Sequence, residues 1–310
     1  MDNHEFDYIR LHFIVLLGGL TPSVVKLISL PSLELVFFRT LITVVILSAY
    51  ILYRRYRFQY TFAQILRMTS SGILLSLYWV FFILAAKIAT ASVAAVGVAT
   101  TTLWITLLEP LLFKRRTEPF QGLMALNAIF GIYIIYNSDF QYDKGFAFGI
   151  AAGFFAALLT IQSSRFSRKN YNPFSVTLYQ MLGAFIGTSL FIPIYITYLP
   201  SLSQGSFIYD VNITDLLLII FLVLTFSIYA WSTFIRVMQT LPPFTVALVN
   251  NLTPIYAIIV AIFFFGKAEL MNIGFYIGTL LLLVSVFAYP LLRRYNDYMT
   301  RKKGDKKPGN

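Results

Sequence analysis

Long apolar runs separated by short polar breaks dominate the chain. Most runs hold about 20 residues, the length an α-helix needs to cross the ~30 Å hydrocarbon core of a bilayer. They lack the alternation of apolar and polar positions that marks the strands of a membrane β-barrel. The pattern therefore predicts an all-α polytopic membrane protein with ten transmembrane helices.

The breaks place five helices in each half of the chain. In the first half they are expected at residues 11–29, 32–53, 68–87, 92–113 and 119–138. In the second half they are expected at residues 145–164, 173–198, 213–236, 244–266 and 270–292.

The composition agrees with this prediction and narrows the chemistry. The 310 residues are 58% hydrophobic and only 12% charged, with a mean hydropathy of +0.74, whereas soluble domains are about 25% charged. The chain has no cysteine, and its two histidines, His4 and His12, precede or begin the first apolar run. Because catalytic and metal sites need several converging ionisable groups, we expect no enzymatic activity, no metal and no cofactor.

The basic residues are distributed unevenly among the connections. Lys and Arg gather in every second one, for example at residues 54–57, 114–116 and 165–169, and again in the tail. The positive-inside rule therefore predicts that both termini face the cytoplasm. The basic tail, residues 296–310, is interpreted as an anchor at anionic lipids, not as a nucleic-acid site. The first apolar run has no signal-peptide cleavage site and is expected to remain as a helix.

The two halves resemble each other. The segment SVAAVGVATTTLWITLLEPLLFKRR from Ser92 aligns without gaps on TVALVNNLTPIYAIIVAIFFFGKAE from Thr245, at a shift of 153 residues. An odd number of helices per repeat makes the second repeat enter the membrane from the opposite side. The sequence thus predicts two inverted five-helix repeats, residues 1–140 and 141–295, an architecture typical of secondary transporters.

The same segments carry a family resemblance. The pattern PPFTVALVNNLTPIYAIIVAIFFFGKAEL and its first-half counterpart ATASVAAV resemble the EamA family of the drug/metabolite transporter superfamily. The resemblance implies a bacterial inner-membrane carrier, often an exporter, with a central cavity and either a proton gradient or substrate exchange as its drive. Thr101 stands where the second half has Pro254, and helix 92–113 is predicted to be continuous.

A polar stretch, NNLTP, interrupts the apolar run at residues 244–266. Its polar groups fall about 9 to 14 Å into the membrane, close to the middle of the bilayer core. They either line a cavity or provide hydrogen bonds and a packing kink between helices. The predicted cavity residues of this segment and its first-half counterpart are Thr101, Asn250, Asn251, Thr253 and Tyr256, with Pro254 as a hinge.

Arg39 is the most costly residue of the predicted spans, because a charge at depth in a bilayer costs at least ~2.5 kcal/mol. It either extends back to the headgroups or faces the cavity, where it binds an anionic group or pairs with a carboxylate. No carboxylate is expected at its depth. Gln180 is its neutral counterpart in the second half.

Several aromatic residues are expected at mid-depth, away from the interfacial belts. They are Tyr78, Trp79, Trp104, Tyr229 and Trp231. They either pack the core or form a stacking wall for an apolar or aromatic substrate.

These features favour a secondary transporter that moves a small organic metabolite, amino-acid-like or drug-like, by alternating access, with export as the expected direction. A membrane structural or sensory protein and a lipid-modifying enzyme are the alternatives. The partners expected are the small-molecule substrate and the lipid bilayer, and no nucleic acid. The sequence leaves open the substrate, the coupling ion and whether the chain forms a homodimer.

Overall fold

The computed structural model describes residues 3–56, 58–113, 119–137, 141–198, 212–241, 249–250, 252–284 and 288. Its first helices are α1 (Asn3–Leu27), α2 (Ser32–Tyr53), α3 (Phe62–Ile88), α4 (Ala91–Ala99), α5 (Thr101–Phe113), α6 (Pro119–Asn137), α7 (Asp143–Arg168) and α8 (Pro173–Tyr198). The later ones are α10 (Ile213–Leu222), the π-helical η1 (Val223–Ala230), α11 (Trp231–Thr240), α13 (Thr253–Phe265), the 3₁₀-helical η2 (Gly266–Glu269) and a helix at Ile273–Val284. Within the described residues there is no strand, so the all-α prediction is confirmed.

Seven helical stretches among the described residues are long and apolar enough to cross a membrane. They are Phe6–Leu27, Ser32–Tyr53, Phe62–Ile88, Ala91–Leu108, Asp143–Arg168, Pro173–Pro193 and Ile213–Thr240. Two of them include more than one element: Ala91–Leu108 covers α4 and part of α5, and Ile213–Thr240 covers α10, η1 and α11. Two shorter apolar helices, Leu126–Asn137 and Ile273–Val284, accompany them. The protein is therefore a multi-pass membrane protein.

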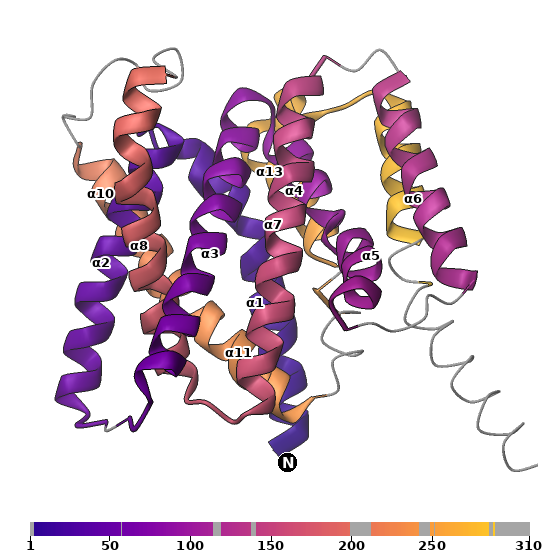
Figure 1. Cartoon of the computed structure of the whole chain (residues 1–310). Helices are drawn as coiled ribbons and strands as arrows, with labels where there is room; N and C mark the ends of the chain where they lie inside the picture. Colours follow the sequence, from indigo (N-terminus) through magenta and orange to yellow (C-terminus); the bar gives the residue numbers. More distant parts are fainter. Residues whose placement is uncertain are drawn as a thin grey trace, which may run out of the picture. The chain divides into compact units, whose positions relative to one another are not determined.

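The chain divides into two compact units, each built from both halves of the sequence (Figure 1). Unit 1 comprises residues 1–101 and 141–270, and unit 2 comprises residues 102–140 and 271–310. In unit 1, the N-terminus and the α2–α3 and α7–α8 connections lie at the same end, at the bottom of Figure 1. We call this the basic end of unit 1, because Arg54, Arg55, Arg165, Arg168 and Lys169 lie in or beside these connections.

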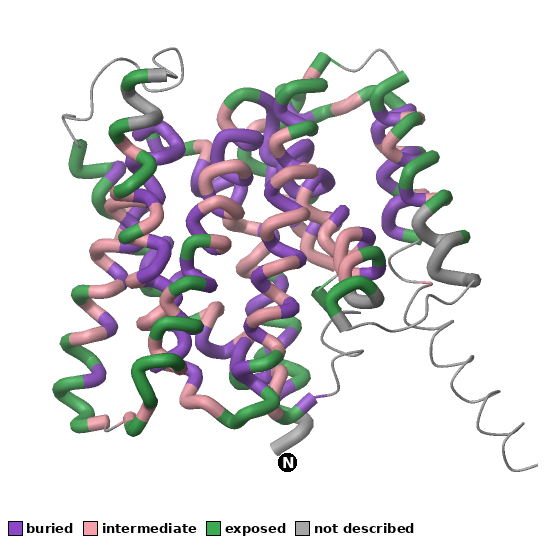
Figure 2. The backbone as a smooth tube through the Cα atoms, in the orientation of Figure 1, coloured by how far each residue is buried: buried purple, intermediate pink, exposed green. Residues whose placement is uncertain are grey.

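Close contacts between small residues hold α3, α4, α7 and α8 together. A side chain on Gly97 of α4 would place its Cβ 2.6 Å from the Cα of Gly149 on α7, so both positions need glycine. A side chain on Gly72 of α3 would place its Cβ 2.7 Å from the Cα of Gly183 on α8. Large apolar side chains such as Val45, Leu190 and Phe263 are exposed, as contact with lipid requires. Figure 2 shows exposed positions recurring along the helices among buried and intermediate ones.

The predicted helix 92–113 is interrupted at Thr100, so the expectation of a continuous helix is wrong. The hydroxyl and the amide of Thr100 both donate to the carbonyl of Gly97, at 2.6 and 3.2 Å, and tighten the last turn of α4. Gly153 of α7 leaves the space beside this turn, because a Cβ there would collide with the Thr100 hydroxyl. A threonine and a glycine on the neighbouring helix thus interrupt the helix without a proline.

The second-half counterpart is also interrupted. α13 begins at Thr253, and Pro254 lies in its first turn, where the missing N–H of proline has no helical partner to lose. Pro254 therefore starts a helix, whereas the sequence suggested a kink inside one. Asn251 lies outside the described residues.

Two predicted helices begin earlier than expected. α1 begins at Asn3 and not at residue 11, and α3 begins at Phe62 and not at residue 68. Thr61 and Gln64 form a capping box that fixes the start of α3, so the helix extends through the polar residues before its apolar run.

Unit 2 is held by a close helix pair. The side-chain amide of Asn127 on α6 donates to the carbonyl of Leu281, at 3.0 Å, in the helix Ile273–Val284. Gly131 of α6 lies against the backbone of Gly278. Trp104, on α5, is the only predicted site residue in unit 2.

Candidate functional site

A buried cation occupies the middle of α2. Arg39 carries a charge within an apolar span of 22 residues, and only 2% of its surface is exposed. Its Nε donates to the Ser227 hydroxyl at 2.8 Å, and its Cζ lies 3.8 Å from the ring centroid of Trp79. Tyr78 lies within electrostatic range of the guanidinium. We call Arg39, Tyr78, Trp79 and Ser227 the Arg39 centre.

The Arg39 centre contains no carboxylate. Within the described part of the chain, Arg39 forms no ion pair, and its remaining guanidinium N–H groups have no protein acceptor. Arginine carries five N–H donors and no acceptor. The centre therefore retains donor capacity and a positive charge beside an aromatic face. The Arg39 side chain is thus enclosed by the helices of unit 1 and is not on their exposed surface.

Ser227 reaches Arg39 from a π-helical turn. Residues 223–230 form η1, between α10 and α11, and no feature of the apolar pattern predicted it. The π-helix is rare, and where it occurs it is frequently at a functional site. Here it presents Ser227 to Arg39 and Trp231, four residues on, to a second polar cluster.

That second cluster surrounds Gln180 of α8, which is fully buried. Its Nε2 donates to the hydroxyls of Ser71, at 3.1 Å, and Ser163, at 3.0 Å, and its Oε1 accepts from the indole N–H of Trp231 at 2.8 Å. We call Ser71, Ser163, Gln180 and Trp231 the Gln180 centre. Its amide is already bonded on both sides, so this cluster connects α3, α7, α8 and α11 as a structural core.

Among the described residues, three further predicted ones, Tyr229, Thr101 and Asn250, form no hydrogen bond or ring contact with either centre. Tyr229 is 42% exposed and packs edge-on against Phe13, 6.0 Å between centroids. The hydroxyl of Thr101 bonds to the carbonyl of Val98 at 2.6 Å, beside the break after α4. Asn250 is exposed.

Thr253 and Tyr256 lie where α13 passes close to α1. Thr253 packs beside Gly18, and the Cβ of Tyr256 lies where a side chain on Gly19 would be, 2.5 Å from its Cβ. Pro254 is buried at the same crossing. These residues thus take part in the α1–α13 packing.

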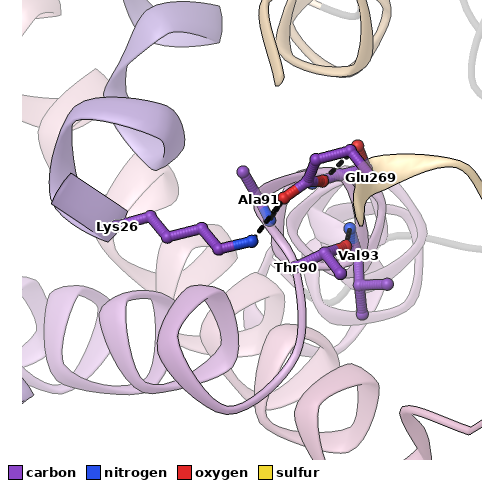
Figure 3. A network of polar contacts seen from close by, with 6 residues as sticks. Lys26, Thr90, Ala91, Val93 and Glu269 are labelled. Carbon is purple, nitrogen blue, oxygen red and sulfur yellow. Dashed lines mark hydrogen bonds and ion pairs between the residues drawn. The ribbon is translucent and has the colours of Figure 1, made fainter. Parts of the chain in front are cut away.

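A buried carboxylate that the sequence reasoning missed lies at the other end of unit 1. Glu269 in η2 is fully buried and accepts from Lys26 Nζ at 2.7 Å (Figure 3). It also accepts from the amides of Ala91, at 3.1 Å, and Ser92, at 3.0 Å, and from the Ser92 hydroxyl at 2.8 Å. We call Lys26, Ala91, Ser92 and Glu269 the Glu269 network.

The Glu269 network caps α4. Thr90 accepts from the amide of Val93 at 3.1 Å, so the first three amides of the helix all have side-chain acceptors (Figure 3). Burial alone would raise the pKa of Glu269, but the hydrogen bonds from Lys26, Ser92 and Ala91 outweigh it and hold the pKa below the ordinary carboxyl value. In the sequence, the only indication of this cap was that Glu269 lies three residues after the end of the predicted helix 244–266.

Further polar contacts connect the helices at the end of unit 1 that holds the Glu269 network. Asp215 of α10 accepts from the backbone amide of Ser29, at 2.9 Å, and from its hydroxyl. Lys87 donates to the carbonyl of Ile28 and lies within electrostatic range of Asp215 and Glu34. Together with the Glu269 network, these contacts join α1, α3, α4, α10 and η2.

Among the described residues, no three His, Cys, Asp or Glu side chains lie close enough to hold a metal ion. The Arg39 centre offers a planar cation, a hydroxyl and aromatic faces, which are groups able to contact an anion and an adjoining aromatic or apolar part.

Comparisons with known proteins agree with this picture. The chain matches the EamA-like transporter family twice, over residues 11–137 and 143–289. A crystal structure of a protein aligns with a TM-score of 0.58 over 94% of this chain and 98% of that one, at 18% identity, which shows a shared fold alone. No curated protein sequence matches the chain.

The two family matches and the apolar helices identify a multi-pass membrane transporter of the drug/metabolite superfamily. The chain belongs to the EamA-like transporter family. That family consists of transporters and not of enzymes.

Proposed function

We propose that this protein is a secondary transporter that moves a small organic metabolite with an anionic group across the cytoplasmic membrane, in the direction of export. The substrate is amino-acid-like or drug-like, and Arg39 binds its anionic group. The observation that carries the proposal is the burial of Arg39 in an apolar span. Its partners are a hydroxyl and an indole, and none of the described carboxylates forms an ion pair with it.

The energetics favour a ligand at this position. An uncompensated buried charge costs several kcal/mol, so it persists only where other interactions offset it. Stacking on a tryptophan contributes about 2 kcal/mol when desolvated, which offsets part of the cost. A substrate carboxylate would supply the rest, and Trp79 and Tyr78 would contact its adjoining apolar part.

The sequence repeat supports transport by alternating access between two inverted five-helix repeats. The family matches twice along the chain, at residues 11–137 and 143–289. The break at Thr100 and the start of α13 at Thr253 correspond at the repeat shift of 153 residues. Helix breaks at corresponding positions of the two repeats typically form the substrate sites of secondary transporters, and one repeat then rocks against the other around the site.

The distribution of charge supports an orientation. The basic end of unit 1 would face the cytoplasm under the positive-inside rule. The Glu269 network and the Asp215 contacts would then close the outer side. Alternating access would require these contacts to separate when the site opens outward.

The test compares cells that produce the wild-type chain, Arg39→Gln, Arg39→Lys or no transporter, with all organic anions measured inside and outside. We expect wild-type cells to release particular anions and Arg39→Gln cells to retain them. Arg39→Lys should be impaired as well, because lysine keeps the charge but loses the planar fork.

Arg236→Gln is the matched control, because Arg236 is an exposed arginine of α11 at the end of a predicted span. It should transport normally. If both Arg39 variants transport like the wild type at equal expression, the binding role of Arg39 is wrong. If release concerns only neutral or cationic metabolites, the anionic substrate class is wrong.

A further inference from the structure

A separate hollow of about 310 Å³, lined by basic, amide and aromatic side chains, lies at the basic end of unit 1, between the start of α3 and the end of α7. Its lining residues are Gln64, Arg67, Gln162, Arg165, Phe166, Lys169 and Tyr171. The α7 members recur at helical spacing and share one stripe of that helix. Arg67 is twelve residues from Trp79 along α3, or about 18 Å, so this basic hollow is distinct from the Arg39 centre.

The basic hollow offers donors, and its lining has no carboxylate. The side-chain oxygen of Gln64 already accepts from the amide of Thr61 at 2.8 Å, and that of Gln162 accepts from Arg165 at 3.4 Å. The cationic groups of Arg67, Arg165 and Lys169 have no acceptor capacity at all. The hollow thus has three positive charges, and both of its amide oxygens already accept hydrogen bonds. This combination is suited to an anion.

The surroundings indicate where the anion comes from. Phe166 and Tyr171 stack at 6.0 Å and form the apolar wall of the hollow. On the adjacent face of α3, Phe62 is 78% exposed and Leu66 is 54% exposed. Exposed apolar residues beside the end of a membrane-spanning helix suit an acyl chain, and a basic pocket between helices at this level suits a lipid headgroup.

We propose that the basic hollow binds the phosphate of an anionic phospholipid. Arg67 and Lys169 hold the phosphate from opposite helices, Arg165 contributes a third charge, and Phe62 and Leu66 contact an acyl chain. The favourable effect of basic residues at a helix C-terminus accounts for Arg165 and Lys169 on α7. It accounts neither for Arg67 at the start of α3 nor for the hollow between the two helices.

The experiment measures lipid bound to the full chain, purified in detergent, by native mass spectrometry. The probes are phosphatidylglycerol and phosphatidylcholine with identical acyl chains. We expect the wild type to retain phosphatidylglycerol in preference. Each cation near a membrane surface contributes about fivefold in affinity, so Arg67→Gln, Arg165→Gln and Lys169→Gln together should weaken retention on the order of a hundredfold.

The control removes the same charge elsewhere at this end. Arg54→Gln, Arg55→Gln and Arg168→Gln replace three exposed arginines that do not line the hollow. Retention should stay near the wild-type level in this variant. An equal loss in both triple variants would mean diffuse attraction to the surface, and no loss in either would mean that no headgroup binds here; each result overturns the proposal.

Two further measurements separate the pocket from its charge and the lipid from soluble anions. Gln162→Phe keeps all three cations but fills the hollow, so it should also lose phosphatidylglycerol; normal retention would overturn the assignment. Inorganic phosphate and glycerol phosphate should leave the thermal stability of the delipidated protein unchanged. If either stabilises the wild type but not the hollow variant, the ligand is a soluble phosphate and the lipid assignment is wrong.

Discussion

Arg39 and Glu269 are both buried charged side chains of unit 1, but among the described residues Glu269 has an oppositely charged partner and Arg39 has none. Glu269 receives hydrogen bonds from Lys26, Ala91 and Ser92, and the Lys26 ammonium also lies 4.7 Å from the Phe265 ring. Arg39 has one hydroxyl and one indole face. A satisfied buried charge fixes structure, whereas an incompletely satisfied one leaves binding capacity.

The two buried charges should differ in how much they contribute to stability. Removing one partner of a satisfied buried pair leaves the other without compensation and is strongly destabilising. Replacing an incompletely compensated charge by an apolar side chain can be neutral or stabilising. The two centres should therefore respond in opposite ways to the loss of their charge.

The largest effect is expected at Glu269. Glu269→Ala leaves Lys26 without its partner and two amides of α4 without acceptors, so it should lower the free energy of unfolding by about 3 to 5 kcal/mol. Reversible unfolding in mixed micelles measures this change. Lys267→Ala, at an exposed position of the same 3₁₀ turn, should change it by less than about 0.5 kcal/mol. Equal stability of the two variants would contradict a structural role for the Glu269 network.

Arg39→Met should give the reverse pattern. It removes the buried cation and keeps an unbranched apolar chain, so unfolding should change by about 1 kcal/mol or less, or become harder. Transport should fall roughly 30- to 150-fold, because a hydrogen bond to a charged group contributes about 2 to 3 kcal/mol to binding. A loss of stability as large as that of Glu269→Ala, with residual transport, would make Arg39 structural.

The pH dependence of stability distinguishes the network further. Because the pKa of folded Glu269 is below its ordinary value of 4.5, the carboxylate stabilises the folded state at any pH above 4.5. This contribution is lost only as the pH falls below 4.5 and through the folded pKa. The stability difference between wild type and Glu269→Gln, about 1 to 2 kcal/mol, should be constant from pH 5 to 8. A difference that shrinks between pH 7 and 5 would show that Glu269 takes up a proton in the working range.

Much of the fold could be predicted from the apolar pattern, because hydropathy and helix length are local properties of the chain. Ser32–Tyr53 and Pro173–Tyr198 have the predicted bounds. The break at Thr100 could not be predicted, since it depends on Gly153 of a helix fifty residues away. The interleaving of the two halves within each unit is also a property of tertiary packing alone.

The site was predictable in part for a similar reason. Arg39, Gln180 and the mid-span tryptophans stand out in an apolar sequence because burying them is costly. The serines that bond to them, Ser71, Ser163 and Ser227, do not stand out in the sequence, because serine is common in membrane helices. Each of these serines also lies on a different helix from the residue it contacts. Glu269 was overlooked because a carboxylate just beyond a helix is normally solvated, and only the approach of α1 and α4 buries it.

The smallest effect on stability is expected at Asn250. Its side-chain amide can be compared with that of Gln180, as the charge of Arg39 can with that of Glu269. Gln180 is buried with every hydrogen bond made inside unit 1, whereas Asn250 is exposed and its side chain has no hydrogen bond to the described residues. Each interhelical hydrogen bond in a membrane protein contributes about 0.6 kcal/mol, so Asn250→Ala should alter unfolding by less than that amount. If the residue lines the substrate path next to the break before α13, the same variant should slow transport, measured with the anion that wild-type cells release. A loss of 0.6 kcal/mol or more with normal transport would instead place Asn250 in helix packing, alongside Gln180, and would remove it from the site.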